Sequence, residues 1–186
     1  MALFPSLPEN AGLGDLLARH PGGMRPLMEW LDALLRGPSE LTIGERELIA
    51  AYVSGLNACT FCHSSHLLYA ELFGIAPGKL EALLEAPEKA PFGARLRPLL
   101  AYVEKLTRLP ARLGQADVDA VLAAGWSEAA LFDAVKICGA FSLMNRLVEG
   151  AGIRFDYATD PDALPNRDDP ARHAHTYLDF ANRLGL

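Results

Sequence analysis

Residues 47–66 read ELIAAYVSGLNACTFCHSSH. This stretch contains Cys59 and Cys62, two of the three cysteines of the chain, and His63 and His66, two of its five histidines. The cysteines form a Cys-x-x-Cys pair, and His66 follows the second cysteine by four residues. We interpret this spacing as a dithiol redox site, which the rest of the chain serves to position.

Two helices joined by a turn are predicted across this stretch. Thr42 and Glu45 have the spacing of a capping box, which predicts a helix from residue 42 to about residue 56. A turn follows at residues 55–57, and a second helix is predicted from about residue 58 to residue 73, closed by a glycine. The cysteine pair would then lie at the start of the second helix.

The same helical pattern continues outward in both directions, and no convincing alternating pattern of a strand is present. In residues 25–35, apolar side chains including Trp30 fall on one predicted face, and Gly150 and Gly152 are predicted to end a long helix. The fold class is therefore all-α, with about eight helices. The further predicted helices are 13–20, 25–35, 77–86 (starting at Pro77), 96–107, 115–123, 128–149 and 171–184.

The chain is expected to form one domain overall, in three parts. Residues 1–24 form an N-terminal arm, residues 25–155 an all-α domain, and residues 156–186 a loop followed by a docking helix. One helix pair before residue 75 and another between residues 96 and 150 indicate a degenerate internal duplication.

Composition excludes several classes of protein. Hydrophobic residues make up 51% and charged residues 22%, which is typical of a globular chain. The net charge is −6 and there is no cluster of Lys and Arg, so neither nucleic acid nor a membrane surface is an expected partner. We expect a cytoplasmic protein, because the N-terminus lacks a basic signal region. Mean hydropathy of +0.12 favours a homo-oligomer that buries apolar surface between subunits.

Helix geometry makes thiol chemistry feasible at this pair. Cα atoms three residues apart lie ~5 Å from each other, which is within the range that a disulfide requires. The free amides at a helix start favour thiolate, and His66, one turn after Cys62, can accept a proton. Glu47 lies twelve residues before Cys59, where a helical hairpin can bring its carboxylate to the imidazole.

With Glu47 and Cys59-x-x-Cys62-x-x-x-His66, the chain resembles the AhpD-like alkylhydroperoxidases of the carboxymuconolactone decarboxylase superfamily. Residues 44–66, together with residues 122–147 (LAAGWSEAALFDAVKICGAFSLMNRL), resemble the peroxidase-related branch of that superfamily, whose members are all-α and oligomeric. The resemblance covers roughly residues 25–155. One departure is that AhpD has a histidine between the two cysteines, where this chain has Phe61.

The resemblance implies a thiol-dependent peroxidase. Cys62 would be the peroxidatic thiol, Cys59 would resolve its sulfenic acid as a disulfide, and Glu47 and His66 would form a proton relay. His63 is an auxiliary candidate that could substitute for the missing histidine. No metal or cofactor is expected; the substrates would be a small hydroperoxide and an external thiol or dithiol reductant, which could be protein-bound.

Other functions remain open at this point. The Phe61 departure leaves room for a thiol–disulfide oxidoreductase or for a non-enzymatic redox sensor with little peroxidase activity. A zinc site would need the four Cys and His side chains of residues 59–66, which crowd on one helix without a second ligand pair elsewhere. Cys138 is expected in the core, and Asn145 is expected to have a structural role.

Overall fold

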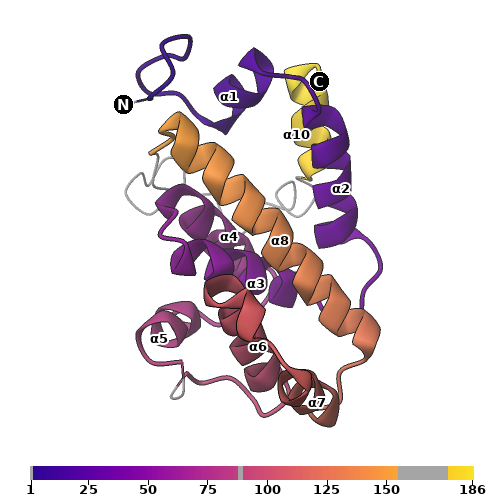
Figure 1. The fold of residues 1–186 in the computed structure, drawn as a ribbon. Helices are drawn as coiled ribbons and strands as arrows, with labels where there is room; N and C mark the ends of the chain where they lie inside the picture. Colours follow the sequence, from indigo (N-terminus) through magenta and orange to yellow (C-terminus); the bar gives the residue numbers. More distant parts are fainter. Residues whose placement is uncertain (1, 88–89, 155–175) are drawn as a thin grey trace.

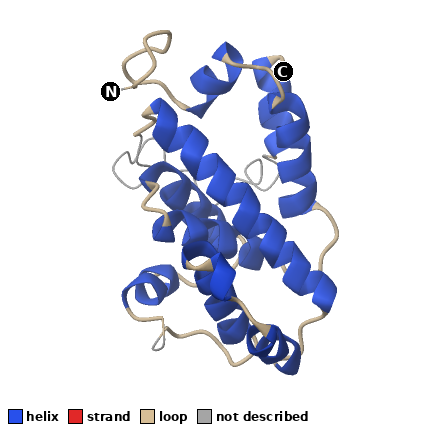
Figure 2. Cartoon of the chain, in the orientation of Figure 1, coloured by secondary structure: helices blue, strands red, loops and turns tan. Residues whose placement is uncertain are grey.

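The computed structural model of the chain describes residues 2–87, 90–154 and 176–186, and in these residues it has nine α-helices, one 3-10 turn and no strand (Figures 1 and 2). The predicted all-α fold is thus confirmed. The helices are α1 (Leu13–Arg19), α2 (Met24–Arg36), α3 (Ile43–Leu56), α4 (Thr60–Leu72), α5 (Lys79–Glu85), α6 (Leu96–Arg108), α7 (Gln115–Ala123), α8 (Glu128–Ala151) and α10 (Tyr177–Leu184), and the 3-10 turn is η1 (Pro110–Arg112).

Helices α3 and α4 form a closely packed hairpin. The predicted capping box opens α3: the backbone N–H of Glu45 donates to Thr42 Oγ1 at 3.2 Å, and the N–H of Thr42 donates to Glu45 Oε2 at 2.8 Å. A Cβ atom on Gly44 would lie only 2.5 Å from the carbonyl oxygen of Phe73, so the first turn of α3 approaches the end of α4 as only glycine allows. The hairpin therefore has a fixed register.

A tight turn between α3 and α4 places Cys59 at the start of α4. The N–H of Cys59 bonds the Ser54 carbonyl at 2.9 Å, and Ala58 adopts a left-handed conformation with φ of 56°. Cys59 is the N-cap residue, and the helix begins at Thr60, two residues later than predicted. The delay arises because Ala58, which was assigned to the helix, turns the chain instead.

Helix α8 is the longest and crosses the whole molecule diagonally in Figure 1. Ser127 caps its start, where its Oγ accepts the N–H of Ala130 at 3.1 Å. The helix passes through Gly150 and ends at Ala151, where Gly152 takes the left-handed conformation with φ of 75°. The prediction that Gly150 also ends this helix is wrong, because a glycine within a helix can keep helical dihedrals.

The C-terminal helix α10 packs beside α2, as Figure 1 shows. Arg25 of α2 donates to Asn182 Oδ1 at 2.9 Å, and the N–H of Leu178 donates to Asp32 Oδ1 at 3.2 Å. The predicted start of this helix at residue 171 lies outside the described residues. In the described part of the chain, Thr176 caps the helix, which begins at Tyr177. The expected docking helix thus docks on the body of its own chain.

The larger of two apolar cores in the described residues joins α2, α3, α6 and α8, and α10 contributes the fully buried Ala181 to it. Trp30 does not enter this core: it is 42% exposed, so its predicted place on the buried face of α2 is wrong. The start predicted at Pro77 is also wrong, since α5 begins at Lys79 after a left-handed Gly78. The boundaries of the three parts and the internal duplication stay predictions. None of the described helices has the length and apolar character needed to cross a membrane.

Candidate active site

A cavity of about 470 Å³ opens beside the first turns of α4. Two of its walls come from α4 and α8, and the segment before α1 and helix α10 close the other side. Its lining is largely apolar, but three predicted site residues, Glu47, Cys62 and His66, reach it. The other lining residues are Asn10, Ala11, Gly12, Leu13, Gly14, Arg36, Phe61, Ser65, Leu68, Tyr69, Phe141, Met144, Thr176, Tyr177, Phe180 and Arg183.

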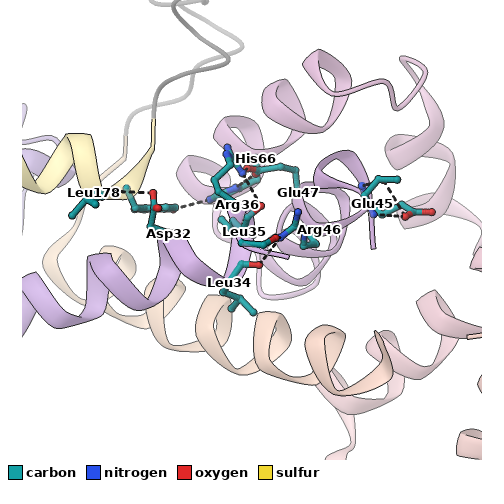
Figure 3. A network of polar contacts seen from close by, with 12 residues as sticks. Asp32, Leu34, Leu35, Arg36, Glu45, Arg46, Glu47, His66 and Leu178 are labelled. Carbon is teal, nitrogen blue, oxygen red and sulfur yellow. Dashed lines mark hydrogen bonds and ion pairs between the residues drawn. The ribbon is translucent and has the colours of Figure 1, made fainter. Parts of the chain in front are cut away.

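Glu47 lies between the Arg36 guanidinium and the His66 imidazole. Its carboxylate is 1% exposed; Arg36 Nη1 lies 2.5 Å from Oε1, and His66 Nδ1 lies 2.5 Å from Oε2 (Figure 3). Burial alone would raise the pKa of Glu47, but the charges and hydrogen bonds of His66 and Arg36 hold this pKa below its ordinary value. Glu47 is therefore a carboxylate at neutral pH.

Arg36 is the last residue of α2, and backbone contacts hold it in place. The neighbouring Arg46 of α3 donates to the carbonyls of Leu34 at 3.0 Å and Gly37 at 2.8 Å, and so ties the end of α2 to α3 (Figure 3). The Arg36 guanidinium also lies 5.1 Å from the ring centre of Phe73. The cation is thus fixed by packing as well as by Glu47.

His66 has a defined orientation. Because Nδ1 faces the Glu47 carboxylate, Nε2 points toward the cavity side, where Tyr177 Oη lies 3.1 Å away. The imidazole packs edge-on against Phe141, with ring centroids 4.3 Å apart. A carboxylate on one nitrogen leaves the other nitrogen to exchange a proton, as in other nucleophile–base–orienter chains.

Both sulfurs of the pair are buried thiols, but they differ in electrostatics and in access. The Cys62 thiol and the Cys62 backbone N–H both donate to the Cys59 sulfur and lower the pKa of Cys59. The same hydrogen bond to Cys59, together with burial, raises the pKa of Cys62. Only Cys62 lines the cavity. The first negative charge of the pair is therefore favoured on Cys59, while a cavity molecule meets Cys62.

Asn145 of α8 also belongs to this site, although the sequence favoured a structural role for it. Its side chain hydrogen-bonds Cys62, which works to lower the pKa of that thiol. The amide is held by Asn57 Nδ2, which donates to its Oδ1 at 2.9 Å, and by Ser54 Oγ, which accepts from its Nδ2 at 2.9 Å. Its place within residues 122–147, the second family-like segment, was the available signal.

His63 lies apart from the other predicted site residues. Its Nδ1 is 3.0 Å from the carbonyl oxygen of Ala51 on α3, and the residue does not line the cavity. In the described part of the chain, no three or more His, Cys, Asp or Glu side chains are grouped as a metal site would require. That the protein needs no metal or cofactor stays a prediction.

Arg36, described above, was missed from the sequence, and so were two further residues. Tyr177 reaches His66 from 111 positions along the chain, and Glu149 hydrogen-bonds Cys59 and works to raise its pKa. Neither residue has a motif spacing relative to the cysteines. In the sequence, Tyr177 falls only within the predicted helix 171–184, and Glu149 only at the end of the predicted helix 128–149.

No protein-family model matches the chain, and no curated protein matches it. Solved structures do match. The AhpD core structure of an uncharacterized peroxidase-related protein from Ralstonia eutropha has a TM-score of 0.73 and 25% identity, and the match covers 84% of this chain and 80% of that one. An uncharacterized peroxidase-related protein from Silicibacter has a TM-score of 0.73 and 24% identity, covering 83% and 79%. A protein of unknown function from Agrobacterium tumefaciens has a TM-score of 0.67 and 19% identity, covering 74% and 93%.

These similarities agree with the resemblance drawn from residues 47–66 and 122–147. The two matches with a TM-score of 0.73 are both peroxidase-related proteins, and each covers more than four-fifths of this chain. The chain therefore has the all-α fold of the AhpD core, and the predicted AhpD-like resemblance is confirmed.

Proposed function

We propose that the protein is a thiol-dependent hydroperoxide reductase with Cys62 as the attacking thiol and Cys59 as the resolving thiol. The observation that carries this proposal is that Cys62 lines a cavity together with the buried Glu47–His66 pair. The likeness to peroxidase-related AhpD-fold proteins supports the same general class.

The first step oxidises Cys62. Its thiolate attacks the terminal oxygen of the hydroperoxide, so that an S–O bond forms and the O–O bond breaks. Cys62 becomes a sulfenic acid, and the leaving oxygen takes a proton and departs as an alcohol. The Cys62 proton can move to the Cys59 sulfur, which already accepts its hydrogen bond. His66, which is hydrogen-bonded to Glu47, supplies the proton for the leaving oxygen.

The second step closes the disulfide. The Cys59 sulfur attacks the Cys62 sulfenic sulfur, an S–S bond forms, and hydroxide leaves and is protonated to water. The position of Cys59 as N-cap of α4, three residues before Cys62, matches the Cα separation of ~5 Å that a disulfide needs. An external thiol or dithiol then reduces this disulfide by thiol–disulfide exchange.

The lining of the cavity favours an organic hydroperoxide of small or moderate size. Phe61, Phe141, Met144 and Phe180 present apolar surface on several sides. Such walls bind an alkyl or aryl group and keep bulk water from the developing charges.

Exposed apolar side chains support the expected homo-oligomer. Phe132 is 60% exposed and Leu143 is 44% exposed, and they lie eleven residues apart on α8, which places them on the same helix face. Burying these side chains against a second copy would remove apolar area from water. The cytoplasmic location stays a prediction.

A thiol–disulfide oxidoreductase is the second candidate, and the position of Phe61 favours it. Phe61, which stands where AhpD has a histidine, lines the cavity next to Cys62. An apolar ring at that place removes one proton donor for the leaving oxygen, which would slow peroxide reduction more than exchange with a disulfide.

The test adds one equivalent of an organic hydroperoxide to the reduced protein and to the Cys59→Ser and Cys62→Ser variants. We expect a disulfide in the parent, a trappable sulfenic acid on Cys62 in Cys59→Ser, and no rapid oxidation in Cys62→Ser. If both variants consume peroxide like the parent, the proposal is wrong. If the parent forms its disulfide only with disulfide donors, the second candidate is correct.

A further inference from the structure

We propose that Tyr177 is a catalytic residue whose phenol passes the proton from His66 to the oxygen that leaves when Cys62 attacks a hydroperoxide. This inference rests on the proposed peroxidase function, and it goes beyond that function because it assigns a general acid from the C-terminal helix.

Tyr177 meets the site from a distant part of the chain. It is the first residue of α10, and its Oη lies 3.1 Å from His66 Nε2. The phenol ring stacks on the imidazole with an angle of 20° between their planes and 6.3 Å between their centroids. Tyr177 and Cys62 line the same cavity. The phenol thus contacts the histidine and also borders the space that a substrate would occupy.

Contacts of the two neighbouring residues hold Tyr177 in this place. Thr176 caps α10 through its Oγ1, which accepts the N–H of Asp179 at 3.1 Å. Leu178, which follows Tyr177, donates its N–H to Asp32 Oδ1 of α2 at 3.2 Å (Figure 3). Because the backbone on both sides of Tyr177 is bonded, the phenol is positioned before a substrate arrives, as an efficient acid must be.

The phenol keeps its proton at neutral pH. Burial raises the pKa of Tyr177, and the nearby Glu47 carboxylate raises it further, against a smaller opposite effect of Arg36. Tyr177 therefore acts as a hydroxyl that can both donate and accept, and not as a phenolate.

The geometry of His66 directs its proton through Tyr177. Glu47 occupies Nδ1, so Nε2 is the nitrogen that gains and loses a proton, and Tyr177 Oη is its hydrogen-bond partner within the described residues. A proton that leaves Nε2 along this hydrogen bond arrives at Oη. The phenol can give up its own proton at the same time.

The proposed step balances as follows. The Cys62 thiolate attacks the terminal peroxide oxygen, the S–O bond forms and the O–O bond breaks, and the leaving alkoxide takes the phenolic proton. Tyr177 Oη is reprotonated from His66 Nε2, which leaves a neutral imidazole bonded to Glu47. The sulfur is oxidised to sulfenic acid and the peroxide is reduced to an alcohol, so no other reactant is needed.

The test is Tyr177→Phe, which removes the hydroxyl and keeps the ring that stacks on His66. The variant is compared with the parent against two oxidants: an alkyl hydroperoxide, which expels a basic alkoxide, and a peroxycarboxylic acid, which expels a weakly basic carboxylate. The loss of a general acid predicts a rate about 10²-fold lower with the alkyl hydroperoxide. The rate with the peroxycarboxylic acid should change much less, because its leaving group needs little help from an acid.

Tyr102→Phe is the matched control, because it removes a phenol from α6 outside the cavity, and it should leave both rates unchanged. Equal slowing with both oxidants in Tyr177→Phe, or no slowing with either, would overturn the role of Tyr177. A parent protein that reacts with neither oxidant would instead refute the peroxidase function. These two failures are therefore distinct.

Discussion

Two regions of the molecule contain buried cysteines, and these cysteines differ in their position on the helix and in their access to a cavity. Cys59, Cys62 and Cys138 are 0%, 4% and 3% exposed. Cys138 lies in the middle of α8, its sulfur 3.3 Å from Thr107 Oγ1, and burial raises its pKa. Cys59 and Cys62 lie at a helix start and are hydrogen-bonded to each other. Cys62 also lines a cavity together with the buried Glu47–His66 pair. The comparison teaches that the start of the helix and the cavity, and not burial, separate a reactive thiol from a structural one.

The largest expected difference is between the alanine variants of Cys62 and Cys138. Cys62→Ala should abolish turnover of hydroperoxide with an excess of dithiol, because the attacking sulfur is gone. Cys138→Ala should leave turnover within a few-fold of the parent, and its cost should be limited to stability. A peroxide-consumption assay measures both. Equal losses in the two variants would remove the distinction between the regions.

Glu47→Gln tests whether the charge of Glu47 matters to the oxidation of Cys62. The amide keeps the shape but cannot carry the charge that orients His66, so the oxidation rate should fall by about 10²-fold. Arg36 would lose its buried partner, and we expect a loss of about 3 kcal/mol of stability in urea unfolding. Glu45→Gln, two residues earlier in the exposed capping box, should cost less than about 1 kcal/mol, because glutamine also completes a capping box, and should leave the rate unchanged.

The pH dependence of stability provides a separate test of Glu47. Its pKa in the folded protein lies below the ordinary value of 4.5, so the charged network stabilises the fold above that pH. The contribution disappears as the pH falls through the depressed folded-state pKa. The difference in unfolding free energy between the parent and Glu47→Gln should therefore be constant near neutral pH and shrink below 4.5. A difference that does not change with pH would contradict the ionised state of Glu47.

Asn145→Ala should have a smaller effect, on Cys62 alone. The amide hydrogen bond works to lower the pKa of Cys62, and a hydrogen bond to a charged group is worth about 1.5–3 kcal/mol. Its loss should slow the alkylation of Cys62 roughly tenfold at neutral pH, while Cys138 keeps its rate. Mass spectrometry of peptides alkylated over a time course measures the two thiols in one sample. A Cys62 rate that stays at the value of the parent would remove Asn145 from the site.

Local signals in the sequence were sufficient for most of the fold. The capping box of Thr42 and Glu45 and the helix at Gln115–Ala123 follow from residues a few positions apart, and the structure reproduces both. The turn before α4 could not be predicted in this way. Ala58 takes a left-handed conformation there, which an alanine rarely adopts without a constraint from the surrounding structure. Trp30 follows the helical pattern of α2, and only tertiary packing decides that it stays exposed.

The residues of the site also divide into those that the sequence predicted and those that it did not. The spacing within residues 47–66 predicted that Glu47 and His66 could meet, and the two are hydrogen-bonded in the structure. Arg36, Asn145 and Tyr177 reach the site from α2, α8 and α10. Their places depend on how distant helices pack; the family-like segment 122–147 marks only Asn145, and no local pattern marks Arg36 or Tyr177. The residues of the hairpin were therefore predictable, and those of the surrounding helices were not.

The most direct test of the difference between the two cysteine regions is a disulfide map of the protein after one equivalent of an organic hydroperoxide. Remaining thiols are alkylated at once, and the peptides that contain Cys59, Cys62 and Cys138 are identified by mass spectrometry. The account predicts a disulfide between Cys59 and Cys62 and an alkylated Cys138. Oxidation of Cys138 at the same rate, or two alkylated thiols at Cys59 and Cys62, would contradict it.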